Sequence, residues 1–208
     1  LRPLVRNEDG TTAKGKTADL SRKHKVKVSD SGVISIMGGK LTTYRKMSEH
    51  TVDEVVKHTG KAKKCKTKNL QFIGAKGFKS SMSDGPDAHL AERFGSELNR
   101  VKELIAQDSS LAEPLIAGLP YLRAEAVFAC RNEMAQTLDD VLSRRTRARI
   151  INRRATLASA RKVAELMATE LHWDAAEIDR QVAFFVDSCS REEAAGLVSE
   201  AEFLASVQ

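Results

Sequence analysis

The sequence predicts an α+β fold, with a short β-hairpin in the N-terminal third followed by a mainly α-helical C-terminal domain. Two observations predict this order. Residues 23–37 carry apolar side chains in alternation and then in a short run, as strands do, whereas from about Asp87 onward apolar residues recur at helical spacing and Gly and Pro become scarce. We therefore expect two parts, residues 1–72 and residues 73–208.

The predicted hairpin begins near Lys23. Val26 and Val28 alternate with polar neighbours, which is typical of a half-buried strand. The turn-forming sequence SDSG follows at residues 29–32, and the apolar run VISIM at residues 33–37 then predicts a more buried second strand.

A helix is predicted to begin at Thr42 and to end at Gly60, a natural stop. Its apolar face would comprise Tyr44, Met47, Thr51, Val52, Val55 and Val56. The basic segment 57–68 is then interpreted as a surface linker. The sequence LQFIG at residues 70–74 is compatible with a short strand, and residues 74–88 have the composition of a loop.

Helices account for the rest of the chain. The predicted stretches are 89–107 as one or two helices, 124–134, 137–146 with Thr137 as its N-cap, 149–171 as the longest helix, 174–189 and 191–206. Phe184 and Phe185 are predicted to lie in the core.

The composition is that of a water-soluble globular protein. The 208 residues are 41% hydrophobic and 30% charged, and no apolar run approaches the ~18 residues of a membrane span. The three cysteines lie far apart and form no CxxC pair, which predicts reduced thiols and neither a disulfide framework nor a zinc site. We therefore assign no metal ligands and predict a cytoplasmic protein.

The net charge of +6 is distributed unevenly. Residues 1–68 contain 17 Lys and Arg against 7 Asp and Glu, whereas residues 69–208 contain 17 against 21. A basic half suits phosphate groups, nucleic acid or an anionic membrane surface, although a solvated surface accounts for most of these lysines. The arginine-rich segment 143–155 has no interleaved aromatic side chains, so we interpret it as a helix face rather than a nucleic-acid site.

Gly38, Gly39 and Lys40 lie between the second predicted strand and the predicted helix. Two departures count against a P-loop: Ile34 occupies its first glycine position, and Leu41 stands where Mg²⁺ binding needs Ser or Thr. Glycines let a ligand approach the backbone, and the first N–H groups of a helix form an anion site. Spacing alone leaves two interpretations open: a ligand site, and a tight turn with an exposed lysine.

The longer segment GGKLTTYRKM at residues 38–47 resembles the flavin-side signature of FAD-dependent glycerol-3-phosphate dehydrogenases, within the D-amino-acid-oxidase-like flavoproteins. Other similar segments follow the family's order: LRPLV at residues 1–5, DLSRKHKV at residues 19–26, and the helical segments 124–149 and 166–173. The resemblance therefore covers most of the chain.

The resemblance implies that residues 1–72 are the end of a flavin- and substrate-binding domain and residues 73–208 a helical C-terminal domain. Enzymes of this family open with a βαβ unit whose G-x-G-x-x-G motif holds the FAD pyrophosphate, and this sequence contains no such motif. The chain also starts at Leu1 rather than at a methionine. We therefore expect a C-terminal fragment that by itself is inactive and binds no FAD.

The implied reaction oxidises sn-glycerol 3-phosphate to dihydroxyacetone phosphate, with hydride transfer to flavin N5 and electrons passed to a quinone. Reduced flavin carries negative charge near N1 and the C2 carbonyl, which a helix N-terminus would stabilise. The resemblance assigns five residues to this cofactor contact: Gly38, Gly39, Lys40, Leu41 and Thr42.

The family's substrate-contacting basic positions match Arg2, Arg22 and Lys40. All three are assigned to substrate binding, and Arg2 and Lys40 also to catalysis. Arginine suits a phosphate ester because its planar fork donates two parallel hydrogen bonds, whereas Arg2 or Arg22 taken alone would be interpreted as a surface salt bridge. His24 is interpreted as a polar structural residue, with a flavin or proton-path contact as the alternative.

The implied partners are glycerol 3-phosphate and a quinone, without nucleic acid. Peripheral association with the inner face of the cell membrane and a homodimer are left open. The competing hypothesis is an independent binding module, for nucleic acid through the basic N-terminal half or for a protein through the helical half.

Overall fold

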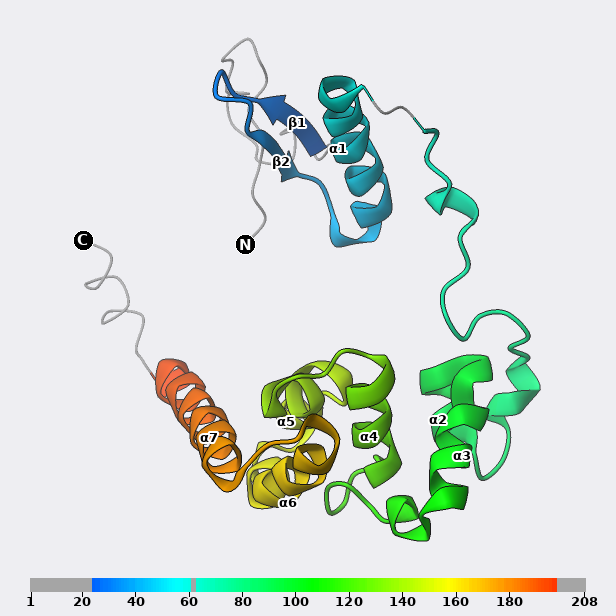
Figure 1. Ribbon diagram of the computed structural model, residues 1–208, viewed down its shortest axis with the longest axis vertical. Coiled ribbons are helices and arrows are strands. Elements are labelled where there is room, and N and C mark those ends of the chain that lie inside the picture. The colour runs from blue at the N-terminus through cyan, green and yellow to red at the C-terminus, as the bar shows by residue number, and fades with distance from the viewer. Residues whose placement is uncertain (1–23, 61–62, 198–208) are drawn as a thin grey trace. The chain divides into compact units, whose positions relative to one another are not determined.

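The computed structural model describes residues 24–60 and 63–197 (Figure 1), so the predicted substrate ligands Arg2 and Arg22 lie outside the described residues. The chain divides into two compact units, Leu1–Gln71 and Phe72–Gln208. Within the described residues, the first unit holds two strands and one α-helix, and the second holds helices and one isolated β-bridge, between Pro114 and Leu122. The predicted α+β class is therefore confirmed.

The two strands form the predicted antiparallel hairpin. β1 (His24–Val28) pairs with β2 (Ile34–Gly38), with Val26 opposite Ile36. The turn closes where the Ser29 N–H donates to the Val33 carbonyl at 2.9 Å, and Gly32 supplies the positive φ of +83° that the turn needs.

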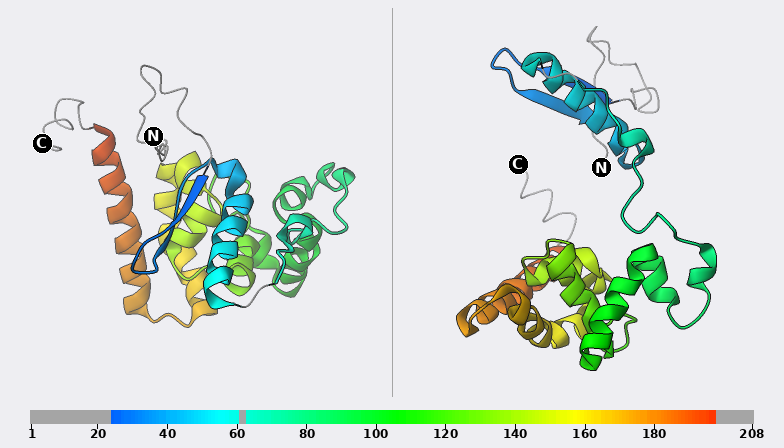
Figure 2. Two further views of the ribbon diagram at one scale, coloured as in Figure 1. Left: turned by 90° about the horizontal axis from the view of Figure 1, so that it is seen from above. Right: turned by 45° about the vertical axis from the view of Figure 1, so that its right-hand side comes forward.

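Helix α1 (Tyr44–Thr59) follows a single 3-10 turn, Leu41–Thr43, and packs against the hairpin (Figure 2). It ends as predicted at Gly60, whose φ of +68° lets its N–H donate back to the Val56 carbonyl at 2.9 Å. No residue of α1 is buried, so the helix rests on the hairpin through a partly exposed face.

The second unit contains six α-helices among its described residues: α2 (Ala88–Phe94), α3 (Leu98–Gln107), α4 (Arg123–Asn132), α5 (Ala148–Ile151), α6 (Arg153–Leu171) and α7 (Ala175–Leu197). Helix α4 lies between the two apolar clusters of this unit. Its residues Val127 and Phe128 pack with α2 and α3, while Ala126 and Ala129 pack with the cluster around Phe185 of α7. Because alanines admit close approach, α6 can pack directly on α4.

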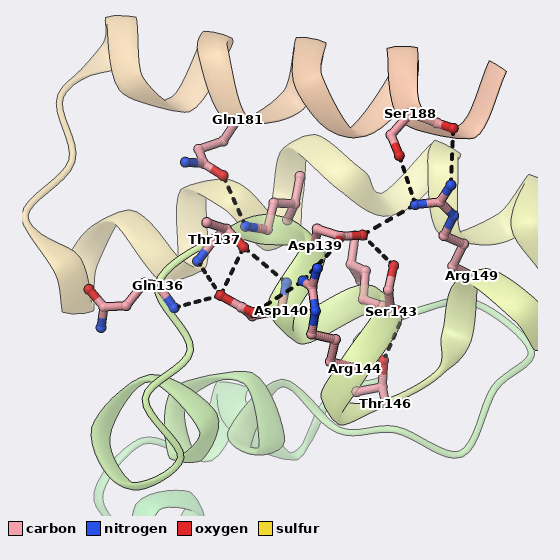
Figure 3. Close-up of polar contacts among 12 residues, drawn as sticks. Gln136, Thr137, Asp139, Asp140, Ser143, Arg144, Thr146, Arg149, Gln181 and Ser188 are labelled. Carbon is pink, nitrogen blue, oxygen red and sulfur yellow. Dashed lines mark hydrogen bonds and ion pairs between the residues drawn. The ribbon is translucent and has the colours of Figure 1, made fainter. Parts of the chain in front are cut away.

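The segment between α4 and α5 contains a π-helical stretch, η7 (Asp140–Arg145), and polar contacts from the residue two positions before η7 and from α5 reach α7 (Figure 3). The Leu138 N–H donates to Gln181 at 3.1 Å, and Arg149 donates to the Ser188 carbonyl at 3.0 Å. Arg149 also forms an ion pair with Asp139 at 3.3 Å. Several arginines of segment 143–155 therefore pair with acidic and polar groups, as the sequence predicts. The segment is not a single helix face, however, because it runs through η7 and α5 and enters α6 after a break at Asn152.

Thr137 and Asp140 cap the start of this helical segment. The Asp140 N–H donates to Thr137 Oγ1 at 3.1 Å, and the Asp140 carboxylate accepts from the Thr137 N–H at 3.0 Å. Burial would raise the pKa of Asp140, but hydrogen bonds from Thr137 and from the backbone of Gln136 outweigh it and hold that pKa below its ordinary value. The prediction that Thr137 is an N-cap is confirmed.

Several expectations for the secondary structure and core are wrong. The predicted helix over 149–171 is interrupted at Asn152, whose side chain accepts from the Ala155 N–H at 3.0 Å and starts α6 anew. The longest helix is α7 with 23 residues, against 19 in α6, and it runs unbroken through Ser190, where two separate helices over 174–189 and 191–206 were predicted. Residues 70–74 form no strand, since 70–72 have no regular structure and 73–74 begin a turn. Phe184 is 59% exposed although its neighbour Phe185 is fully buried.

None of the helices that the structure describes is long and apolar enough to cross a membrane.

Candidate functional site

The Gly38-Gly39-Lys40 turn connects β2 to the helical segment. Gly38, the last residue of β2, has a φ of +75°, and Gly39 has a φ of +80°. Two consecutive residues with positive φ turn the chain sharply, a conformation that glycine adopts without steric cost. Lys40 returns to an extended backbone and leads into the 3-10 turn.

Thr43 closes the first turn of the helical segment. Its hydroxyl donates a hydrogen bond to the Lys40 carbonyl at 2.8 Å. The same hydroxyl oxygen accepts a hydrogen bond from the Lys40 backbone N–H at 3.2 Å. The first N–H groups of a helix have no intrahelical acceptor and carry the positive end of its dipole. The backbone at Leu41 and Thr42 therefore offers donors to an anionic or electron-rich ligand.

A hollow of about 630 Å³ opens beside this turn, between β2 and α1. Its walls are largely apolar and include Ile36, Leu41, Tyr44 and Met47. Lys40 also lines the hollow. Leu41 is 89% and Tyr44 53% exposed. The site therefore combines an apolar surface with a cation and helix N–H groups, a pattern suited to a flat aromatic ligand with a negative edge.

The nearby charges leave Lys40 available. The Lys46 ammonium and the Arg45 guanidinium both bond Glu49, each at 3.0 Å, and these bonds lower the pKa of Glu49. Lys40, by contrast, is exposed and forms no ion pair with any residue between 24 and 60 or between 63 and 197. The Lys40 ammonium is therefore available to form an ion pair with a ligand.

The structure brings five predicted site residues together at this hollow: Gly38, Gly39, Lys40, Leu41 and Thr42, the first four on its lining and Thr42 within the same turn. The sequence analysis missed six further lining residues, among them Tyr44 and Met47, whose helical spacing was interpreted as a core-facing stripe. The place of Tyr44 and Met47 directly after the Gly-Gly-Lys turn was the available signal.

Gly39→Ala should disrupt this turn more than Gly32→Ala disrupts the hairpin turn. Both glycines have φ near +80°, where an alanine costs about 1–2 kcal/mol. At Gly39, however, the new Cβ would lie 2.6 Å from Met47 Sδ, whereas at Gly32 it would meet nothing within 4 Å. Hydrogen exchange of the β1 and β2 amides measures the difference, and equal effects of the two substitutions would contradict it.

A family profile, the C-terminal domain of alpha-glycerophosphate oxidase, matches residues 65–178. Among characterised proteins, glycerol-3-phosphate dehydrogenase 2 of Mycobacterium tuberculosis is 35% identical over 199 residues, which cover 89% of this chain and 33% of that protein. A probable mitochondrial glycerol-3-phosphate dehydrogenase of Dictyostelium discoideum is 33% identical over 187 residues, 83% of this chain and 29% of that protein.

A solved structure shows the same likeness. The glycerol-3-phosphate dehydrogenase of Bacillus halodurans, complexed with FAD, superposes with a TM-score of 0.63 at 28% identity, covering 79% of this chain and 36% of that one. The chain thus spans about a third of the length of the proteins it matches.

Proposed function

This chain belongs to the glycerol-3-phosphate dehydrogenase family, and on that premise we propose that it is the C-terminal part of a flavoenzyme that oxidises sn-glycerol 3-phosphate to dihydroxyacetone phosphate. The observation that carries the proposal is the Gly-Gly-Lys turn at the apolar hollow between β2 and α1. FAD, when bound, supplies the hydride acceptor, and electrons then pass to a quinone.

The hollow fits one edge of a flavin ring. Its apolar walls suit a flat aromatic system, and the helix N–H groups with Lys40 suit the edge that becomes negative on reduction. The two glycines leave the backbone without side chains where the ring would approach. We assign the cofactor contact to Gly38, Gly39, Lys40, Leu41 and Thr42.

The substrate phosphate needs fixed cations. Lys40 is exposed and unpaired among the described residues, so it can bond a phosphate oxygen without first breaking an ion pair. Arg2 and Arg22 would supply planar guanidinium donors to the same phosphate, which hold it in one orientation. In this proposal Lys40 and Arg2 also fix the carbinol carbon relative to the flavin, while the remaining two thirds of the enzyme bind most of the cofactor.

We propose that the enzyme is located in the cytoplasm and transfers electrons to the quinone at the inner face of the cell membrane. A quinone is a lipid-soluble acceptor, so the enzyme must reach the bilayer surface, and the positive charge of residues 1–68 would favour an anionic surface.

The test is a fusion protein that joins this chain to the portion of the Bacillus halodurans enzyme that the chain does not match. The fusion protein should bind FAD stoichiometrically and oxidise glycerol 3-phosphate with a soluble quinone analogue as acceptor. The isolated chain should be colourless, and the Bacillus portion alone is the matched control.

The proposal fails if the fusion protein folds but neither retains flavin nor turns over glycerol 3-phosphate. Tight binding of nucleic acid by the isolated chain, with an affinity that falls steeply as salt rises, would instead favour a binding module.

A further inference from the structure

Two histidines that are far apart in the sequence form a hydrogen bond beside the Gly-Gly-Lys turn. His24 Nε2 in β1 and His50 Nδ1 in α1 lie 2.7 Å apart, and the ring centroids are 4.8 Å apart at an interplanar angle of 43°. The contact joins a strand to a helix across 26 residues of sequence.

We infer that His24 and His50 form a positioning pair that holds the Gly38–Lys40 turn in the orientation its ligand requires. The inference about orientation stands on geometry, while its consequence for turnover rests on the proposed function.

One member of the pair, His24, contacts the turn directly. His24 lies opposite Gly38 in the strand register, and a Cβ on Gly39 would lie 3.2 Å from His24 Cβ and 2.6 Å from Met47 Sδ. Met47 and His50 are three residues apart on α1, so they share one face of the helix. The turn is therefore held between β1 on one side and this face of α1 on the other.

The bond matters because it is a directional contact between α1 and the strands of the hairpin. No residue of α1 is buried, so its apolar contacts with the hairpin are partial and non-directional. Arg45 and Lys46 bond Glu49 within the helix, and Arg45 also bonds Thr67 beyond it. A short directional bond from His50 to β1 specifies where the helix N-terminus points, which apolar contact alone does not.

The chemistry of the pair provides matched variants. One imidazole must donate its N–H and the other must accept, so a single proton lies between His24 Nε2 and His50 Nδ1. Asparagine places an amide group near the position of Nδ1 and can keep the bond, whereas leucine fills similar space without a polar atom. His50→Asn and His50→Leu therefore separate the hydrogen bond from the packing.

The first experiment measures hydrogen exchange on the isolated chain, which requires neither flavin nor activity. His50→Leu should speed exchange of the amides at residues 38–44 by about three- to tenfold, as expected from loss of one hydrogen bond. His50→Asn should stay near wild type, and the α4 amides in the second unit should be unchanged in both. Should His50→Leu prevent the hairpin from forming at all, His24→Gln, which retains an amide near the Nε2 position, should preserve slow exchange.

The second experiment measures steady-state kinetics of the fusion protein. His50→Leu should lower kcat/KM for glycerol 3-phosphate by about three- to tenfold with flavin still bound, and His50→Asn should restore it. Equal exchange in the leucine and asparagine variants, or unchanged kinetics in a leucine variant whose exchange is faster, would overturn the inference. An inactive wild-type fusion protein would instead count against the proposed function. The hydrogen-exchange rates of the isolated chain would then be the test of whether the histidine pair orients the turn.

Discussion

Glu125→Leu should lower the free energy of unfolding of the helical unit by about 3–5 kcal/mol, the largest stability effect we expect from one substitution. The Glu125 side chain is fully buried, with Arg93 Nε at 2.6 Å and His89 Nε2 at 2.9 Å from its carboxylate. It also accepts the Leu122 N–H at 2.9 Å at the start of α4. Leucine would leave the Leu122 N–H without its acceptor and the mostly buried Arg93 guanidinium without its carboxylate, with only the Arg145 carbonyl, at 2.8 Å, still accepting from Arg93.

Chemical denaturation followed by circular dichroism measures this loss. Asp179→Asn is the matched control, because it breaks the Arg161–Asp179 ion pair, whose side chains are 54% and 66% exposed, and should cost under about 1 kcal/mol. In the Arg93→Met/Glu125→Leu double variant the loss should be smaller than the sum of the single losses, because neither charge is then left buried alone. A Glu125→Leu loss no larger than the Asp179→Asn loss would show that the buried pair contributes little.

The predictable parts of this fold are those determined locally. The hairpin, the stop at Gly60 and the cap at Thr137 each depend on residues within a few positions of one another, and all three agree with the structure. Turn chemistry, positive φ at glycine and capping hydrogen bonds are visible in a short window of sequence.

The unpredicted parts depend on partners far away in the sequence. Glu125 has the sequence appearance of a solvated helix carboxylate, yet its partners Arg93 and His89 lie 32 and 36 residues earlier. The His24–His50 bond spans 26 residues. Phe184 and Phe185 are adjacent, but only the rotation of α7 against α6 decides that one is buried and the other exposed. Periodicity gives a helix its apolar face but not the neighbour that covers it.

The candidate site also has one part that is determined locally and one part that depends on residues distant in the sequence. The sequence locates the Gly-Gly-Lys turn, because two glycines between a strand and a helix are a local feature. The apolar walls supplied by Tyr44 and Met47 follow only from the angle at which α1 returns along β2. A stripe with helical spacing has the same sequence pattern whether it faces a core or a ligand.

Lys40→Met in the fusion protein should lower kcat/KM for glycerol 3-phosphate about ten- to hundredfold, because a charge-assisted contact contributes about 1.5–3 kcal/mol. FAD should remain bound, since most of its contacts lie outside this chain in our proposal. Lys46→Met is the matched control: Lys46 is a neighbouring lysine that already bonds Glu49 at 3.0 Å, so its loss should leave kinetics near wild type.

Arg2→Ala and Arg22→Ala should mainly raise KM for glycerol 3-phosphate, because they remove cations that hold the phosphate in both ground and transition states. Glycerol, which has no phosphate, should be a poor substrate with or without these arginines. Flavin content must be measured in parallel, so that loss of cofactor is not mistaken for loss of substrate binding. Wild-type kcat/KM in the Lys40, Arg2 and Arg22 variants would show that the substrate phosphate is held elsewhere in the enzyme, whereas a defect confined to Lys40→Met would restrict the phosphate site to the Gly-Gly-Lys turn.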